Sequence, residues 1–382
     1  MGGPYQPNYL KSKNRKLVFD LFKEHKELSR AQIARLTEMS FPTAMRVVDF
    51  LISKDVVRET GQRSTDADGP GRKSKLLQFN PEAFHAIGVE VEGSIVNIGQ
   101  VNLQGEIIER RSVHITSHFS LDYFDEVLDT ITLLKELSET PVLGVGIGFP
   151  GNINHETSEI VSYNPLRITK PTSFTDLLPL IHEKLDIPIL IDNDVNLACA
   201  GEHLVSQNQH EKSLVYISLG TGLGSGFLID GKVWRGDRFS AGEIGNLLLA
   251  PLDSKEMTFP GIANLENLIN IQALQNTFDV SFDSGNPIPL QKQEEIIRYL
   301  VPYLGALIFN LLNILDIRHV VLAGLIPAQL NPLLQNQLEA LFATVPEEIG
   351  EVTISAPLSE YPVLSGAASM VFDKLIFDEF AL

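Results

Sequence analysis

The sequence has a single cysteine, Cys199, and no apolar run of the ~18 residues that a membrane-spanning helix needs. One cysteine cannot form a disulfide within the chain, which suits a reducing compartment. It also excludes a zinc site built from several thiolates. Residues 1–16 include basic side chains but no apolar segment, so they lack the pattern of a secretory signal. We therefore expect a cytoplasmic chain without a membrane partner.

Positive charge is scarce over most of the chain and is concentrated near the N-terminus. The net charge is −18, yet residues 1–80 hold 15 Lys and Arg against 9 Asp and Glu, a net charge of +6. Residues 81–382 hold 15 against 39, a net charge of −24. A basic module on an acidic body is typical of a segment that meets phosphate groups, although an accidental surface imbalance gives the same numbers. The length and the 44% apolar content indicate two or three globular domains.

Residues 15–52 carry three closely spaced helical patterns. Apolar spacing predicts helices over 15–26, from Ser29 to Leu36 and from Ser40 to Ile52, with the two serines as N-caps. Two short helices joined by a tight turn form a helix-turn-helix, whose second helix enters the major groove of DNA by its N-terminus. The residues predicted to lie near base edges are Ser40, Phe41, Thr43, Ala44 and Arg46.

Two predicted strands, 56–60 and 76–79, follow these helices and enclose a turn-rich tip. This hairpin would be a wing, and its basic residues suit contacts with phosphates or the minor groove. These residues are Arg63, Arg72 and Lys73. We predict a winged helix-turn-helix domain over residues 1–80 that binds operator DNA. A three-helix module that binds another protein is the alternative.

From residue 81 onwards, strands and helices alternate in two similar rounds, the only internal symmetry of the chain. Strands are predicted at 86–91, 95–102, 106–115, 142–148 and 187–191, and again at 214–218, 226–229, 232–234 and 319–323; helices are predicted at 121–137, 174–185, from 195, and at 365–377. Two such halves facing a cleft describe an α/β protein with the two-lobed actin-like, ribonuclease-H-like ATPase fold. We expect a first lobe over 81–200, a second over 201–364, and a C-terminal helix that returns to the first.

Several polar and glycine-rich segments of this body have the composition of ligand sites. Asn193 and Asp194 lie where a strand becomes a helix, and an amide beside a carboxylate suits a polyhydroxy ligand. Helix capping by Asp192 or Asp194 is the alternative. Glu243 lies between glycines that let a ligand approach the backbone, unless it is only a surface carboxylate. The glycine run 220–226 offers N–H groups to an oxyanion, although glycine-rich hairpins are common.

Five segments resemble the ROK family of repressors, open reading frames and kinases. They are Ser29–Thr37 with Ser40–Thr43, Gly148–Gly151, Asp192–Ala198 with Gly201-Glu202, Gly220–Gly226, and Ala241–Gly245. In the kinases of this family, Asp194 matches the general base that removes the proton of a sugar hydroxyl. Residues matching Asn193, Glu243 and Glu266 hold the sugar. Asn164 is predicted as a further sugar contact, or is only a turn residue before a proline.

The sequence departs from this family at the nucleotide and zinc motifs. The first phosphate loop, DxGGT in the kinases, reads Glu90-Val91-Glu92-Gly93-Ser94 here, so that Glu92 repels ATP phosphates. The loop at 323–325 has one glycine where the kinases have two. We describe the phosphate loops as degenerate and expect no cofactor; their residues are Glu92, Gly93, Ser94, Gly220, Thr221 and Gly222.

At the zinc positions stand Asn246, Met257, Phe259 and Asn264, none of them a good zinc ligand, so we expect no metal. Asn246 replaces a histidine that contacts the sugar, and can supply only a hydrogen bond.

The resemblance is to regulators of the xylose-repressor and N-acetylglucosamine-repressor type. It implies a sugar-responsive transcriptional repressor of carbohydrate-utilisation genes, with a catalytically inactive sugar-kinase-like domain. The implied partners are operator DNA, a sugar or sugar phosphate, and a second copy in a homodimer or tetramer, with dimerisation helices in the second lobe. An active ROK-type sugar kinase with an added DNA-binding domain is the alternative. A regulator controlled by a protein partner, with a vestigial cleft, is a third hypothesis.

Overall fold

The computed structural model describes most of the chain, and its residues divide into two compact units. Unit 1 comprises Met1–Asp194, His203–Gln209 and Val363–Leu382, and unit 2 comprises Val195–Glu202 and His210–Pro362. The described residues are 7–63, 75–92, 95–114, 121–157, 159–162, 172–173, 184–206, 212–248, 264–282, 287–346 and 350–377. The helix Asp194–Val205 is divided between the units, because Val195–Glu202 belong to unit 2 and its two ends belong to unit 1.

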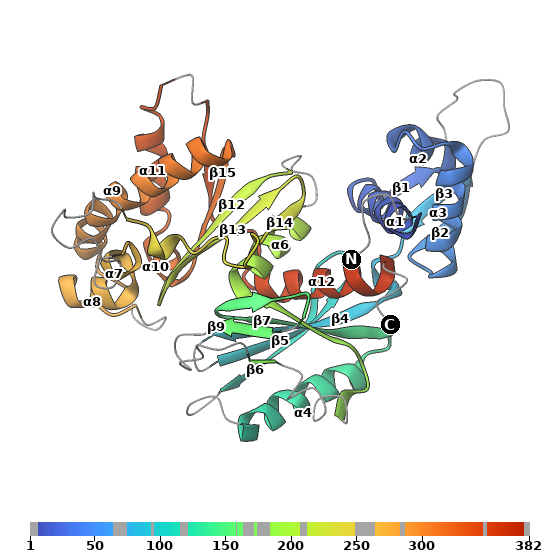
Figure 1. Ribbon diagram of the computed structural model, residues 1–382, viewed down its shortest axis with the longest axis horizontal. Helices are drawn as coiled ribbons and strands as arrows, with labels where there is room; N and C mark the ends of the chain where they lie inside the picture. The colour runs from blue at the N-terminus through green and yellow to red at the C-terminus, as the bar shows by residue number, and fades with distance from the viewer. Residues whose placement is uncertain are drawn as a thin grey trace. The chain divides into compact units, whose positions relative to one another are not determined.

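Unit 1 begins with a small mixed segment, residues 7–80, which we call the head (Figure 1). Its elements are α1 Pro7–Glu24, β1 Glu27–Ser29, α2 Arg30–Leu36, α3 Phe41–Ser53, β2 Val57–Arg63 and β3 Lys75–Phe79, with strand order β1-β3-β2. A capping box starts α2, because Ser29 and Gln32 exchange side-chain-to-backbone hydrogen bonds. The sequence predicted the three helices and the hairpin, but it placed the start of α1 eight residues too late and missed β1.

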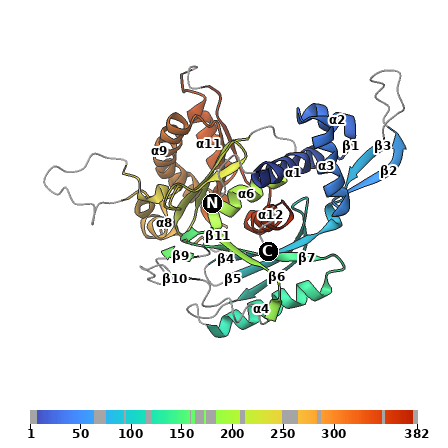
Figure 2. The same ribbon diagram turned by 45° about the vertical axis from the view of Figure 1, so that its right-hand side comes forward.

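The larger sheet of unit 1 has the strand order β11-β7-β4-β5-β6. Its strands are β4 His85–Glu92, β5 Ile95–Asn102, β6 Ile107–His114, β7 Val142–Phe149 and β11 Ile189–Asn193. Helix α4, Leu121–Leu137, covers one face and α12, Pro362–Phe377, covers the other (Figures 1 and 2). A Cβ atom at Gly88 would lie 2.3 Å from the carbonyl oxygen of Leu364, and one at Gly146 would lie 2.3 Å from that of Ala367. These two glycines therefore allow α12 to rest directly on the strands.

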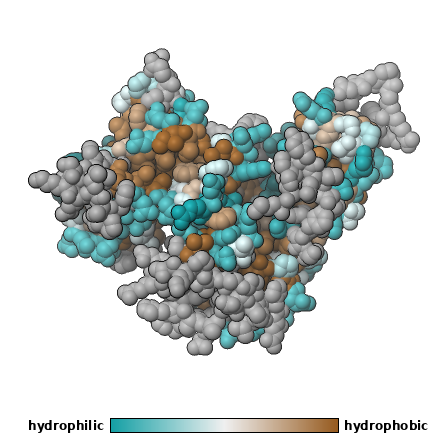
Figure 3. Space-filling model, in the orientation of Figure 1, coloured by the Kyte–Doolittle hydropathy of each residue, from teal (hydrophilic) through white to brown (hydrophobic). Residues whose placement is uncertain are grey.

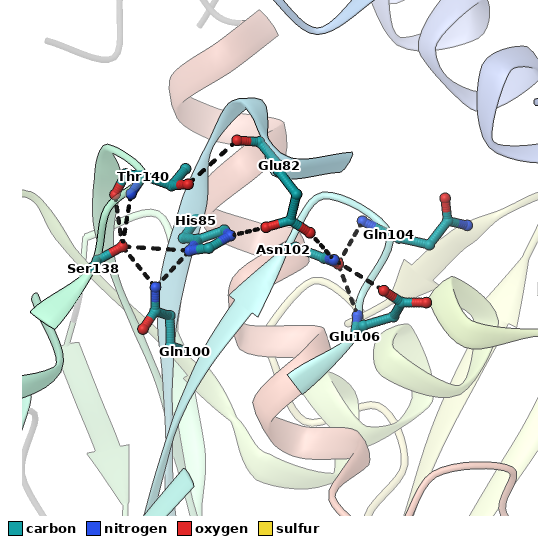
Figure 4. Close-up of polar contacts among 8 residues, drawn as sticks. All are labelled: Glu82, His85, Gln100, Asn102, Gln104, Glu106, Ser138 and Thr140. Atoms are coloured by element: carbon teal, nitrogen blue, oxygen red, sulfur yellow. Dashed lines mark hydrogen bonds and ion pairs between the residues drawn. The ribbon is translucent and has the colours of Figure 1, made fainter. Parts of the chain in front are cut away.

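A polar network joins the short helix η1, Pro81–Ala83, which follows the head, to this sheet (Figure 4). Glu82 of η1 lies with Oε2 2.7 Å from Nε2 of the buried His85, while its Oε1 accepts a hydrogen bond of 2.7 Å from Asn102. Gln100 and Ser138 contact the other ring nitrogen of His85. Ser138 in turn donates its hydroxyl to the carbonyl of Thr140. Since the polar side chains of this network are hydrogen bonded within it, we interpret the network as a structural anchor.

Unit 2 has a five-stranded sheet of order β14-β13-β12-β15-β16. Its strands are β12 Leu214–Leu219, β13 Leu223–Ile229, β14 Lys232–Trp234, β15 His319–Ala323 and β16 Thr353–Ser355. Helix α6, Asp194–Val205, packs on β13, where a Cβ atom at Gly226 would lie 2.6 Å from the Cβ of Cys199. Burial raises the pKa of the Cys199 thiol, so this cysteine acts as a small packing residue.

Helix α9, Leu290–Leu315, supplies much of the core of unit 2. The remaining elements of this unit are η3 Ile244–Asn246, α7 Glu266–Ile269, α8 Ile271–Phe278, α10 Leu325–Leu330 and α11 Leu333–Phe342. By length and composition α9 could cross a membrane, contrary to the expectation from the sequence, and half of its most apolar 18-residue window is buried within the structure. We assign α9 to the core because Leu300, Leu304 and Leu307 are fully buried.

The strands predicted for both rounds are present, with ends that differ by a few residues. The sequence missed β16 and a small antiparallel sheet of β8 Asn152–Asn154, β9 Glu159–Ser162 and β10 Thr172–Ser173. These strands have two to four residues, too few to show a period in the sequence. Most of the helix predicted at 174–185 lies outside the described residues.

Candidate functional site

The first candidate ligand residues lie at the carboxyl end of the unit 1 sheet. Asn193 is the last residue of β11 and Asp194 is the first residue of α6. Because β11 runs parallel to β7 with Asn193 opposite Phe149, the loop after Phe149 lies beside them. The Asn193 side chain donates a hydrogen bond of 3.0 Å to the carbonyl of Gly151 and lies 3.1 Å from Oδ1 of Asp194. Two motifs whose contacting residues are 42 positions apart in the sequence thus meet at one edge, as ligand groups do in α/β folds.

The three consecutive polar residues 192–194 have different environments. Asp192 is fully buried, and its Oδ1 accepts the backbone N–H of Asn193 at 2.8 Å. Asn193 and Asp194 are only partly buried. Since Asp194 opens α6, the positive end of the helix dipole stabilises its carboxylate. Asp192 is therefore a structural residue, and the polar groups suited to a ligand are Asn193 and Asp194.

In unit 2, the segment Ala241–Gly245 folds as a tight turn against β13. Both the N–H and the hydroxyl of Ser225 donate to the carbonyl of Gly242, at 2.9 and 3.1 Å. Gly242 has a φ of +95°, and a Cβ atom there would lie 2.0 Å from the Ser225 carbonyl oxygen. This position accepts only glycine. The turn places Glu243 at the surface, between the buried strand and the η3 helix.

Two carboxylates of unit 2 act on each other. Partial desolvation and the Glu266 carboxylate raise the pKa of Glu243, although the residue as a whole is exposed. Glu266 opens α7, and its Oε2 accepts the backbone N–H of Leu223 at 2.9 Å. This oxygen is also 3.1 Å from where a Cβ atom of Gly222 or of Gly245 would stand. Glu266 thus holds the start of β13, a contact that the sequence did not foresee because its partners are 43 residues apart.

The glycine run at 220–226 is divided between a connection and a strand. Only Gly220–Gly222 connect β12 to β13, with Leu219 paired to Leu223, and residues 223–226 belong to β13. The glycines of β13 allow close packing of the strand against α6. Gly324 lies next to this hairpin, since a Cβ atom there would be 2.4 Å from the Leu219 carbonyl oxygen, and its φ is +99°.

Asn246 and Asn264, which stand where other family members have zinc ligands, lie near each other. Asn264 lies with its side-chain nitrogen 3.5 Å from Oδ1 of the exposed Asn246, and its own Oδ1 accepts the N–H of Asn267 at 3.1 Å. Among the described residues, no group of three or more His, Cys, Asp or Glu could hold a metal ion. Asn246 retains hydrogen-bonding capacity for a ligand.

On the head, the first turn of α3 presents a mixed polar and apolar surface. Phe41 is 54% exposed, Arg46 is exposed, and the hydroxyls of Ser40 and Thr43 are hydrogen bonded at 2.8 Å. Ser40 occupies the N-cap position, but its side chain bonds Thr43 rather than a backbone N–H. The prediction that Ala44 faces DNA was wrong: Ala44 is fully buried, because it lies on the same helix face as Val47, Val48 and Leu51.

Several predicted residues lie outside the described part of the structure. They are Asn164, Gly93, Ser94, Met257, Phe259, Arg72 and Lys73. The backbones of Arg63 and Glu92 are described as strand ends, but their side chains are not.

Comparisons with known proteins match nearly the whole chain. The model of the ROK family matches residues 86–373. The xylose repressor of Bacillus subtilis is 24% identical over 96% of this chain and 97% of its own length. The xylose repressor of Caldicellulosiruptor bescii is 29% identical over 69% of this chain, and that match spans 65% of the relative.

Solved structures show the same fold. A ROK family transcriptional regulator, a homologue of the E. coli MLC protein, superposes with a TM-score of 0.73 at 19% identity, over 97% of this chain and 98% of its own. A putative N-acetylmannosamine kinase from Listeria monocytogenes superposes with a TM-score of 0.61 at 21% identity, over 75% of this chain and 98% of its own. The regulator thus covers the head as well as the body, whereas the kinase covers three quarters of the chain.

Proposed function

Since the chain belongs to the ROK family, we propose that it is a sugar-responsive, DNA-binding transcriptional regulator that represses carbohydrate-utilisation genes. The observation that carries this proposal is the similarity to a xylose repressor along 96% of the chain, which includes the head. A cytoplasmic location follows from the same role.

We assign DNA binding to the head, as a winged helix-turn-helix domain. Its support is the net charge of +6 over residues 1–80 and the exposed first turn of α3. The exposed Phe41 suits apolar contact with a thymine methyl group, and Arg46 suits a guanine or a phosphate. Thr43 and Ser40 would hydrogen bond bases or phosphates, and the wing residues Arg63, Arg72 and Lys73 would contact the backbone or minor groove.

We assign sugar binding to residues carried over from the family motif. They are Asn164, Asn193, Asp194, Glu243, Asn246 and Glu266. Asn193 and Asp194 support this assignment by their place at the carboxyl edge of the unit 1 sheet. Glu243 supports it by its surface position on a turn whose glycines admit close approach. The effector would be a sugar or a sugar phosphate.

We propose that the body no longer transfers phosphate. Glu92 introduces a carboxylate into the first phosphate loop, where it disfavours a polyanion such as ATP. On this view Asp194 keeps the position of the kinase general base but serves as a hydrogen-bond acceptor for the sugar.

A second copy of the chain would bind the uncharged face of α9. From Pro302 to Leu315 this helix carries no charged residue, yet Phe309, Asn310 and Ile314 are exposed, Ile314 by 76%. Apolar side chains gather over the part of the surface formed by α9 and α11 (Figure 3). An uncharged apolar surface is typical of an interface between subunits, and a two-fold dimer matches the symmetry of a palindromic operator.

An active sugar kinase with an added DNA-binding domain is the second candidate. The fold shared with a putative N-acetylmannosamine kinase and the presence of Asp194 favour it. The two candidates differ in whether ATP is consumed.

A panel of pentoses, hexoses, N-acetylated sugars and their 6-phosphates distinguishes the candidates. The thermal midpoint of the full chain would be measured with and without Mg-ATP. We expect one sugar to raise the midpoint, independently of ATP and only when Asp194 is present. Phosphorylated product would establish the kinase instead, and no response to any sugar would favour control by a protein partner.

A further inference from the structure

Helix α12 has two different partners along its length. Its first half rests on the unit 1 sheet, where Leu364 and Ala367 meet the glycines of β4 and β7. Its last turns reach the head. The ring of Phe377 lies 5.0 Å from the ring of Phe19 in α1, and both residues are 2% exposed. Helix α12 thus packs on the sheet whose strand β11 ends at Asn193, and also on α1, the first helix of the head.

An ion pair accompanies this apolar contact. Lys16 of α1 forms ion pairs with Asp373 of α12 and with Asp20 of its own helix. Burial disfavours the Lys16 ammonium, but the Asp373 and Asp20 carboxylates outweigh it, so its pKa lies above the ordinary value. Polar contacts fix the relative position of the two helices more narrowly than apolar packing does, because they require a definite geometry.

Helix α6 reaches the same place from the candidate sugar residues. It begins at Asp194, and His203 lies in its last turn. The Nδ1 atom of His203 is buried, and it has no hydrogen-bond partner among the described residues. Charges that act on this ring are Lys23, Asp20 and Lys16 of α1 and Asp373 of α12. We call Lys16, Phe19, Asp373, Phe377 and His203 the three-helix junction.

A second contact ties α6 to the segment that precedes α12. The buried Glu202 accepts the backbone N–H of Leu358 with both carboxylate oxygens, at 3.0 and 3.1 Å. Leu358 lies four residues before Pro362, the first residue of α12. The chain that leads into α12 is therefore fixed to the helix that begins at Asp194.

We propose that the three-helix junction transmits the state of the sugar residues to the head, so that the α1–α12 contact is part of the switch for DNA binding. This inference rests on the proposed function. A sugar that engages Asp194 acts on the first residue of α6. Glu202 of that helix holds the segment that leads into α12, and α12 in turn contacts α1 through Asp373 and Phe377. The effect on DNA requires that the sugar favour one arrangement of the junction over another.

The test uses the full chain and an operator duplex selected from random DNA. Operator affinity is measured by fluorescence anisotropy with and without the sugar that shifts the thermal midpoint, and the ratio of the two affinities is the coupling. The variants are Lys16→Met, Asp373→Asn, and the exchange of both charges in Lys16→Asp with Asp373→Lys. Lys184→Met is the matched control, because Lys184 pairs with Asp125 and Asp129 at the surface of the same unit.

In each single variant, we expect the ratio of the operator affinities with and without sugar to move toward one by about fivefold or more. The variant should still bind the operator and still show the sugar-induced shift of the thermal midpoint. The exchanged pair should recover part of the coupling, and Lys184→Met should keep all of it. Full coupling in Lys16→Met and Asp373→Asn would overturn the inference. If the single variants do not fold, the exchanged pair decides, since coupling equal to one in a folded exchanged pair would also overturn it. A wild-type chain whose operator affinity ignores every sugar would contradict the proposed function instead.

Discussion

The two large sheets have the same strand order but differ in what their hairpins present. In each sheet, the first strand is central, the next two pair antiparallel on one side, and the last two pair parallel on the other: β11-β7-β4-β5-β6 and β16-β15-β12-β13-β14. The hairpin turn of the second sheet is the uncharged segment Gly220-Thr221-Gly222. The corresponding strand of the first sheet, β4, ends at Glu92, whose carboxylate would disfavour an oxyanion on the proposed account. The topology is thus the same in both sheets, whereas the residues at the two corresponding positions differ in charge.

A second difference concerns the helices that rest on the sheets. Glycines in β4 and β7 bring α12 onto the first sheet, and Gly226 brings α6 onto the second. Helix α12 also packs on the head, through the contact of Phe377 with Phe19. The first sheet is therefore joined to the head by a helix that touches both.

Gly146→Ala should have the largest effect of the changes considered. Its Cβ atom would meet the carbonyl oxygen of Ala367 at 2.3 Å, so α12 would have to move, at a cost of about 3 kcal/mol of stability. Gly226→Ala in the second sheet should cost about 2 kcal/mol, because it meets the side chain of Cys199. Urea unfolding would measure both. Gly220→Ala, with its nearest atom at 3.7 Å, is the control, and equal costs for all three would show that the helix contacts are not tight.

Asp194→Asn should weaken sugar binding by about 2 kcal/mol, roughly thirtyfold, because a charged acceptor of sugar hydroxyls is lost. Calorimetry with the sugar identified by thermal shift would measure the change. Asp129→Asn, an exposed carboxylate of α4, should leave the affinity unchanged. An unaltered sugar affinity in Asp194→Asn would contradict the assignment of Asp194, at the edge of the unit 1 sheet, as a sugar contact.

Lys23→Met should stabilise the protein at neutral pH by roughly 1 kcal/mol, allowing for its partial exposure. Burial and the nearby Lys16 lower the pKa of Lys23 to about 8. The folded chain therefore binds fewer protons than the unfolded chain between pH 8 and the ordinary pKa of 10.5. Below pH 8 the destabilisation is fully present, and it disappears as the pH rises to 10.5. Thermal midpoints of the variant and the wild type should converge over that range; a constant difference would contradict this assignment.

Glu92→Gly should have the smallest effect. Removing one partly screened carboxylate should tighten Mg-ATP binding by under about 1 kcal/mol, a few fold, without producing phosphate transfer. Binding of a fluorescent ATP analogue would measure the change, and Glu82→Gln, which lies in the structural anchor, is a matched removal of charge. Transfer of phosphate by Glu92→Gly would show that a single residue separates this body from an active kinase.

The sequence predicted the head helices, most strands and the place of residues 193 and 194 at a strand-to-helix boundary, because those features depend on local periodicity. Their role as sugar contacts stays a prediction. It could not predict contacts between distant residues. The carboxylate of Glu266 holding Leu223 and the pair Phe19–Phe377 join positions with no shared local pattern. Ala44 was misplaced for the opposite reason: its position was inferred from the helix terminus, whereas burial is set by the helix face.

The most direct test of the central proposal is operator affinity with and without the effector sugar, each with and without Mg-ATP. We predict that one sugar changes operator affinity by about tenfold or more, that Mg-ATP adds nothing, and that Asp194→Asn abolishes the response. Operator binding that ignores every sugar, or a response that appears only with ATP and is accompanied by phosphorylated product, would contradict the account.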